Sequence, residues 1–287
     1  MKYQVIHKTE YQYQHPLSLS YNVACILPCS NIYQNCLSSN LEVSPSPSFF
    51  QENIDFFGNR QSFFNIQQAH SKLSIIANSQ IEVYELDNMI LANSKAWESV
   101  CKEDLDYTQY MIKQYCLDSP LIHIGQQFYD YAKPSFTPKR PLLLAVKELM
   151  QRIYEDFEYT PNFTSISTPL QDVMLHKKGV CQDFAHLAIA CIRSMGLPAQ
   201  YVSGYLETLP PPGKPKIVGS DASHAWFAAY DPAFGWVEFD PTNNQQPTNQ
   251  YIRTAYGRDY SDVTPLKGIL FGGSSHQLNV SVDVSRI

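Results

Sequence analysis

Hydrophobic and polar residues alternate over the first third of the chain, a pattern typical of strands with one buried face. Residues 2–13 place a set of apolar and aromatic side chains on one face, with His7 and Thr9 among them: Tyr3, Val5, His7, Thr9, Tyr11 and Tyr13. Further strand-like runs follow at residues 21–27, 49–57, 61–66 and 72–84, separated by turn-rich stretches. We therefore expect an antiparallel β domain over residues 1–90.

The period changes to that of helices after about residue 93. Helices are predicted at residues 107–116, 121–132 and 141–157, with prolines between them. In the last of these the apolar positions recur every three or four residues: Leu142, Ala145, Val146, Leu149, Ile153 and Phe157. Residues 91–140 are interpreted as a helical linker region, and residues 141–287 as a separate core.

Within this core, a loop at residues 162–179 leads to an apolar helix that begins near Cys181 and is stopped by Gly196 and Pro198. Strands are predicted at residues 200–206, 223–230, 236–240 and, in the tail, 277–284. The Pro- and Gly-rich segment 209–221 is expected to border a cleft. The whole pattern predicts an α+β protein.

Composition limits the classes of partner. The 287 residues are 44% hydrophobic and 17% charged, which allows a sizeable core. A net charge of −6 without a Lys/Arg cluster disfavours nucleic acid and anionic membranes. Apolar runs fall short of the roughly 18–20 residues of a membrane span, and the N-terminus lacks a signal-peptide core. We expect a cytoplasmic protein, and the oligomeric state stays open.

Seven cysteines, an odd number, exclude a complete disulfide framework. Cys25, Cys29 and Cys36 cluster in the sequence, but without a CxxC pair or a histidine at zinc-finger spacing. We interpret them as buried free thiols and expect no metal and no cofactor.

Cys181 is the best candidate for a nucleophile. It lies at the predicted start of a buried helix, where unpaired backbone N–H groups favour a thiolate. A nucleophile of this kind needs a base, and the base needs a group that orients it. His186 is nearest in sequence, yet five helical positions turn it about 140° away. His176, in the preceding loop, stays possible.

His224 is the histidine with a suitable partner. It opens a run in which residues 231–235 (DPAFG) have hairpin-turn chemistry. Folding about Ala233 pairs residues whose numbers sum to 466 and makes His224 and Asp240 diagonal neighbours on one face. A carboxylate can then hold the imidazole. Taken singly, each residue has a structural interpretation: a packed thiol, a strand histidine, a turn. Trp226 and Trp236 are interpreted as packing residues rather than as the lining of a groove.

The segments GVCQDFAHLAIACIRSMGLPAQYVSGYL (179–206), DASHAW (221–226) and WVEFDPTNN (236–244) resemble the transglutaminase-like superfamily, and more narrowly bacterial members described as proposed cysteine proteases. AYGRDYSDVTPLKGILFGG (255–273) and the β-rich N-terminal region resemble the same group. The resemblance implies a papain-like core, a cysteine-bearing helix on an antiparallel sheet. It also implies a triad of Cys181 as nucleophile, His224 as base and later acid, and Asp240 as orienting group.

The expected chemistry is acyl transfer at an amide of a peptide or protein, through a thioester. Hydrolysis is the first choice; a protein-glutamine transglutaminase or a glycan-releasing amidase would use the same triad. The backbone N–H of Cys181 is expected in the oxyanion hole, with a second donor near Tyr159. A non-catalytic binding scaffold is the competing class. A metal site built from Cys181, His224 and Asp183 or Asp240 is the least favoured alternative.

Overall fold

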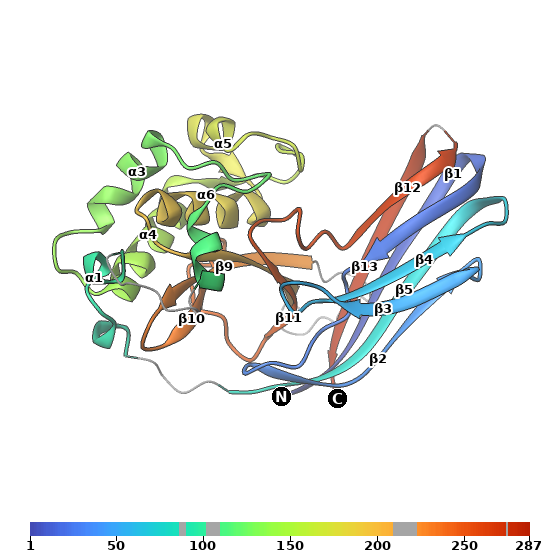
Figure 1. Ribbon diagram of the computed structural model, residues 1–287, viewed down its shortest axis with the longest axis horizontal. Coiled ribbons are helices and arrows are strands. Elements are labelled where there is room, and N and C mark those ends of the chain that lie inside the picture. Colours follow the sequence, from blue (N-terminus) through green and yellow to red (C-terminus); the bar gives the residue numbers. More distant parts are fainter. Residues whose placement is uncertain (86–89, 102–109, 209–222, 274) are drawn as a thin grey trace, which may run out of the picture.

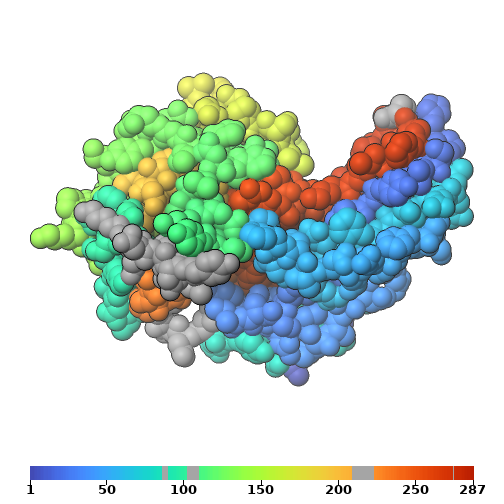
Figure 2. Space-filling model, in the orientation of Figure 1, coloured from blue at the N-terminus to red at the C-terminus, as the bar shows by residue number. Residues whose placement is uncertain are grey.

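The computed structural model describes residues 1–85, 90–101, 110–208, 223–273 and 275–287. Its helices gather in one rounded part of the molecule, and a large sheet extends from this part as an arm (Figure 1). The space-filling view shows the same rounded body and arm (Figure 2). The segment 209–221, predicted to border a cleft, lies outside the described residues. The first three residues of the predicted helix 107–116 also lie outside them.

The arm is a seven-stranded antiparallel sheet. Five strands follow the order β2-β5-β1-β4-β3, and two C-terminal strands pair with β1. Their bounds are β1 Lys2–Ala24, β2 Gln34–Ser44, β3 Phe49–Ile54, β4 Arg60–Ile66, β5 His70–Val83, β12 Leu266–Gly272 and β13 His276–Arg286. The first half of the long β1 pairs with β5 and β13, and its second half pairs with β4 and β12.

The rounded part combines helices with a second antiparallel sheet of order β10-β9-β8-β11. These strands are β8 Ala199–Leu206, β9 Ser223–Asp231, β10 Gly235–Phe239 and β11 Tyr251–Gly257. A short parallel pair, β6 Glu158–Tyr159 and β7 Lys178–Gly179, precedes them. The helices are α1 Trp97–Cys101, α2 Tyr110–Lys113, α3 Gln126–Ala132, α4 Leu142–Asp156, α5 Leu170–His176 and α6 Cys181–Ser194, with 3₁₀ turns η1 Leu91–Asn93, η3 Gln114–Cys116 and η4 Lys133–Ser135.

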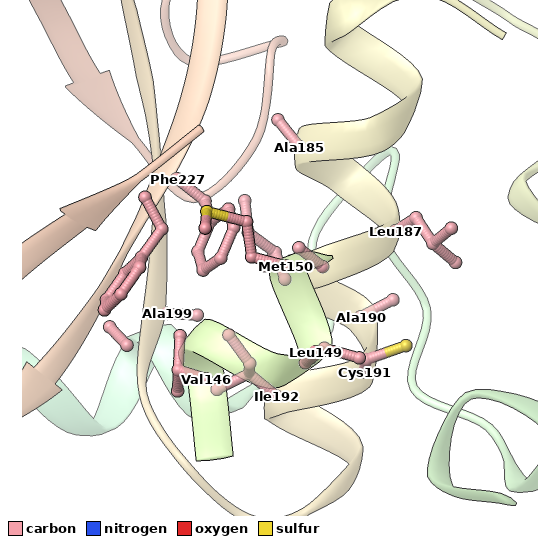
Figure 3. Close-up of a cluster of buried hydrophobic side chains, with 14 of the residues drawn as sticks. Val146, Leu149, Met150, Ala185, Leu187, Ala190, Cys191, Ile192, Ala199 and Phe227 are labelled. Atoms are coloured by element: carbon pink, nitrogen blue, oxygen red, sulfur yellow. The ribbon is translucent and has the colours of Figure 1, made fainter. Parts of the chain in front are cut away.

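The main hydrophobic core lies between α4, α6 and one face of this sheet. Val146, Leu149 and Met150 of α4 meet Ile192 of α6, with Phe227 of β9 beside them (Figure 3). All are buried. α6 is buried nearly all round, because α3, α4, α5 and the sheet contact it. A helix so enclosed has little freedom to shift its N-terminus.

Most of the predicted elements are present, and the exceptions have local causes. The helix expected at residues 121–132 begins at Gln126, because the N–H groups of Leu121 and Ile124 donate to Asp259 and Asp118 instead of forming a helical turn. The loop predicted at residues 162–179 contains α5, so that prediction is wrong there. The predicted tail strand is present as β13, and it joins the N-terminal sheet.

Candidate active site

Cys181 is the first residue of α6, as the sequence predicted. The preceding Val180 has extended backbone, and its N–H donates to Oδ2 of Asp183 at 2.8 Å, which closes the first turn. Gly179 is required by this closure, since a Cβ there would lie 2.8 Å from the Asp183 Cβ. The thiol therefore lies at a helix N-terminus whose geometry is fixed by its own sequence.

The chain before this helix is attached to it. Tyr159 pairs with Gly179 across β6 and β7, and the N–H of Thr160 donates to the Gly179 carbonyl at 2.8 Å. Thr164 donates its hydroxyl to Oδ2 of Asp183 at 2.5 Å. Asp183 thus binds both this loop and the start of the helix. The metal site considered above would need the same carboxylate, whose Oδ2 already accepts these two hydrogen bonds.

β9 and β10 form the predicted hairpin with the predicted register. Tyr230 pairs with Trp236 and Phe227 with Phe239, so the paired residue numbers sum to 466. Asp240 follows the last residue of β10, and His224 is the second residue of β9. Nε2 of His224 lies 2.7 Å from Oδ2 of Asp240.

Asp240 is fully buried, and five hydrogen bonds surround its carboxylate. Oδ2 accepts from His224 Nε2, from the Tyr251 hydroxyl and from Asn243 Nδ2, each at 2.7 Å. Oδ1 accepts the backbone N–H groups of Thr242 and Asn243 at 2.9 and 3.3 Å. Burial alone would raise the pKa of Asp240, but these donors and the His224 charge outweigh it and lower the pKa below its ordinary value.

His224 is held between Asp240 and the thiol of Cys181. Burial lowers the pKa of His224, but hydrogen bonds and opposite charge from Asp240 and Cys181 more than compensate and raise it to about 10. An ionised carboxylate only accepts hydrogen bonds, so Nε2 carries a proton and Nδ1 is the ring nitrogen left for the thiol. His224 and Asp240 thus form an imidazole–carboxylate pair, and Cys181 is the candidate third member.

Tyr159, near which the second oxyanion donor is expected, lies opposite Gly179, two residues before Cys181. It is half exposed, and burial and then the charge of Cys181 raise its pKa. Its ring also contacts that of Phe184 in the first turns of α6, at 6.4 Å between centroids.

The other candidates lie elsewhere. His186 is buried, and its Nε2 accepts the Tyr260 N–H at 3.1 Å. His176 packs against the Phe163 ring. Trp226 is fully buried and donates to Glu238 at 3.0 Å, so it packs, as expected, and lines no groove.

Sequence reasoning missed Tyr251 and Asn243, the two side chains that join His224 on Oδ2 of Asp240. Asn243 had a usable signal, since an Asn three residues after an Asp in a turn often reaches back to it. Tyr251 had none, because β11 is brought to the site by pairing with β8, and β8 is nearly fifty residues away in sequence.

An enclosed cysteine helix packed on an antiparallel sheet, with a histidine and a carboxylate on a hairpin, defines a papain-like core. Residues 3–82 match the bacterial transglutaminase-like N-terminal region, and residues 130–241 match the transglutaminase-like superfamily. The chain belongs to the transglutaminase-like superfamily and carries this bacterial N-terminal region.

Similar proteins extend over nearly the whole chain. An uncharacterized protein of Mycobacterium tuberculosis is 40% identical over 291 residues, covering 99% of this chain and 92% of that protein. A protein-glutamine gamma-glutamyltransferase of Pseudomonas aeruginosa is 32% identical over 136 residues, 45% of this chain and 20% of that protein. The crystal structure of a proposed cysteine protease from Cytophaga hutchinsonii superposes with a TM-score of 0.74 at 22% identity, over 99% of this chain and 90% of that one. That likeness shows the fold.

None of the described helices is long and apolar enough to cross a bilayer.

Proposed function

We propose that this protein catalyses cysteine-dependent acyl transfer at amide bonds of a peptide or protein, with hydrolysis as the overall reaction. One observation carries the proposal: buried Asp240 binds Nε2 of His224 at 2.7 Å, and Cys181 at the start of α6 acts together with Asp240 to raise the pKa of this imidazole. A scaffold that only binds peptides has no need of this arrangement. The family membership supports cysteine-dependent chemistry in general.

The first half-reaction makes a thioester. The thiol proton passes to His224, and the Cys181 sulfur attacks the amide carbonyl carbon. The tetrahedral intermediate collapses as the imidazolium returns that proton to the leaving nitrogen, so the C–N bond breaks and a free amine departs. Asp240, kept ionised by its donors, stabilises the imidazolium between these two transfers.

The second half-reaction releases the acyl group. His224 removes a proton from water, the oxygen attacks the thioester carbonyl, and the C–S bond breaks. The product is a carboxylic acid, and the thiol of Cys181 is restored. No metal or other cofactor takes part in this scheme.

Negative charge on the carbonyl oxygen needs donors in both halves. The N–H of Cys181 occupies the first helical position, where an α-helix offers no intrahelical acceptor. We propose it as one donor and the hydroxyl of Tyr159, a half-exposed residue opposite Gly179, as the second.

Selective alkylation tests the thiol–imidazole pair without knowledge of the substrate. Iodoacetamide labelling is measured between about pH 5 and 8 and mapped for each cysteine. At the acidic end of this range, Cys181 should be labelled faster than the other cysteines. His224→Ala should slow labelling at Cys181 and leave Cys101 unchanged. Cys101 is an exposed cysteine in the same chain and serves as an internal control. Labelling at Cys181 no faster than at Cys101, and indifferent to His224, would favour a binding scaffold.

Transamidation is the second candidate, because the Pseudomonas aeruginosa relative is a protein-glutamine gamma-glutamyltransferase. The two reactions diverge at the thioester, which is resolved by water or by an amine. A glutamine-containing protein offered together with a fluorescent primary amine separates them. Amine incorporation that is lost in Cys181→Ala indicates a transglutaminase, whereas free acid without incorporation indicates hydrolysis. Release of an Asn-linked glycan would identify the amidase alternative.

The cytoplasmic location stays a prediction.

A further inference from the structure

The outward face of β1 changes character along its length. In the first half, outward positions carry Gln4, Lys8 and Glu10, with Ile6 as the apolar exception, opposite polar residues of β5 and β13 such as Gln80 and Asn279. In the second half the equivalent alternation exposes Tyr21, between the half-buried Leu19 and Val23. A single strand thus has a polar outer surface where it meets β5 and β13, and an apolar outer surface where it meets β4 and β12.

The neighbouring strands continue this apolar surface, because directly opposed residues of antiparallel strands share a face. Tyr21 is opposed by Ile269 on β12 and Asn65 on β4, and Asn65 by Phe49 on β3. The rows on either side add Val23, Phe63, Gln51 and Lys267, and Leu19 with Phe271. We call this surface the aromatic face; its members are Leu19, Tyr21, Val23, Phe49, Gln51, Phe63, Asn65, Lys267, Ile269 and Phe271.

The aromatic face is open to solvent, although the opposite face of β1 and β4 is packed. Its five largest apolar side chains are 39–65% exposed: Tyr21, Phe49, Phe63, Ile269 and Phe271. Ala24, Phe64 and Ile66 on the opposite face are at most 2% exposed and belong to the core of the arm. The outer strands β3 and β12 are exposed on that face too, where Phe50 is 41% and Leu270 39% exposed. β1 and β4 therefore have apolar residues on both faces, the pattern of strands covered on both sides.

The size and charge of the aromatic face suit a second copy of itself. Aromatic side chains present about 150–250 Å² each, so the four aromatic members and Ile269, each about half exposed, offer about 500 Å² together. Two such faces would bury about 1,000 Å², the size at which specific interfaces begin. Lys267 is the one formal charge among the ten members of the face, so two copies meeting about a two-fold axis can keep both lysines at the rim.

We propose that two copies of this chain associate through their aromatic faces, sheet against sheet, with the four strands β3, β4, β1 and β12 of each. This surface belongs to the arm, which extends from the part that holds the helices and the candidate active site (Figure 1). The inference does not depend on the proposed reaction.

Sedimentation velocity over a protein concentration range of about 1–100 µM tests this, because it covers the dissociation constants of weak dimers. The wild-type chain should shift from monomer to dimer as concentration rises. Ile269→Lys adds a charge at the most exposed member of the aromatic face and should stay monomeric throughout. Ile6→Lys is the matched control: Ile6 is 40% exposed on the polar half of β1, and its substitution should leave the dimer intact.

A second variant, Tyr21→Lys, places a charge at another position of the aromatic face and should also stay monomeric. Thermal unfolding followed by circular dichroism verifies that each variant is folded. A wild-type chain that is monomeric at every concentration overturns the proposal and means that another occupant, or none, covers the face. Folded Ile269→Lys and Tyr21→Lys variants that dimerise like wild type overturn it equally.

Discussion

Replacing Tyr251 by phenylalanine removes one buried hydroxyl and tests the support of the candidate triad. This hydroxyl donates to Oδ2 of Asp240 and accepts from Nε2 of Gln245, both at 2.7 Å. The ring is fully buried and lies edge-on to Trp226 at 5.2 Å. Because Phe fills almost the same space, Tyr251→Phe changes the hydrogen bonds and leaves the packing in place.

The expected cost follows from the charge of the acceptor. A hydrogen bond to an ionised group contributes about 1.5–3 kcal/mol, and four other donors still contact the Asp240 carboxylate. Gln245 is exposed, so water can replace its lost partner. We expect the free energy of unfolding in urea to fall by about 2 kcal/mol.

The variant should also change His224. With one donor fewer, the Asp240 carboxylate bonds more strongly to the imidazolium, so the pKa of His224 should rise further. In a pH profile of Cys181 alkylation, the alkaline limb that reports loss of the imidazolium should move to higher pH. A role confined to packing would not move this limb.

Tyr154→Phe, at a half-exposed position on α4, is the matched control and should change neither quantity. The reasoning would be refuted if Tyr251→Phe had the free energy of unfolding of wild type and the alkaline limb of its alkylation profile lay at the same pH. A loss of stability without movement of the limb would restrict Tyr251 to a structural role.

Three further outcomes are expected. Arg253→Met leaves Glu238 as an uncompensated buried charge and should lower the free energy of unfolding by about 3–5 kcal/mol, whereas adding Glu238→Gln should recover much of the loss, as urea titrations will show. Because folding raises the pKa of His224 from 6.5 to about 10, its stabilising contribution is complete below about pH 6.5 and is lost as pH rises towards 10; the urea midpoint of wild type should fall over this window more than that of His224→Gln. Gly204→Ala would drive a Cβ into the Ile252 carbonyl oxygen, a backbone atom that cannot yield, and should cost at least about 1–3 kcal/mol in the same titration.

The hairpin that holds His224 and Asp240 was predictable because its information is local. Asp231 and Gly235 bound a turn of defined chemistry, Asp231 caps it by accepting the N–H of Ala233 at 2.9 Å, and Gly235 adopts a positive φ of 72° that favours glycine. Once the turn is set, the register follows along both strands. The helix start at Cys181 was predictable for a similar reason.

β11 was not predictable from its own residues. Five of its seven positions in succession are buried, so neither the alternation of a half-exposed strand nor helical spacing appears. Arg253 lies inside this strand. In the sequence an arginine indicates a surface position, and its burial becomes understandable only when folding places Glu238, fifteen positions earlier, next to it. The same holds for Tyr251, whose acceptor is on another strand. These contacts depend on tertiary packing, which local pattern does not encode.

The N-terminal arm has a direct part in placing this strand. β11 is an edge of its sheet, and an edge leaves backbone groups unpaired. The buried amide of Gln34 satisfies both backbone groups of Arg253, donating to its carbonyl at 2.7 Å and accepting its N–H at 2.8 Å. Asn59 does the same for Tyr256, at 2.7 Å in each direction. Because an amide side chain offers both N–H donors and a carbonyl acceptor, each imitates a residue of a neighbouring strand. The arm therefore completes the edge of the sheet on which Tyr251 stands, and through Tyr251 it bears on the carboxylate that holds His224.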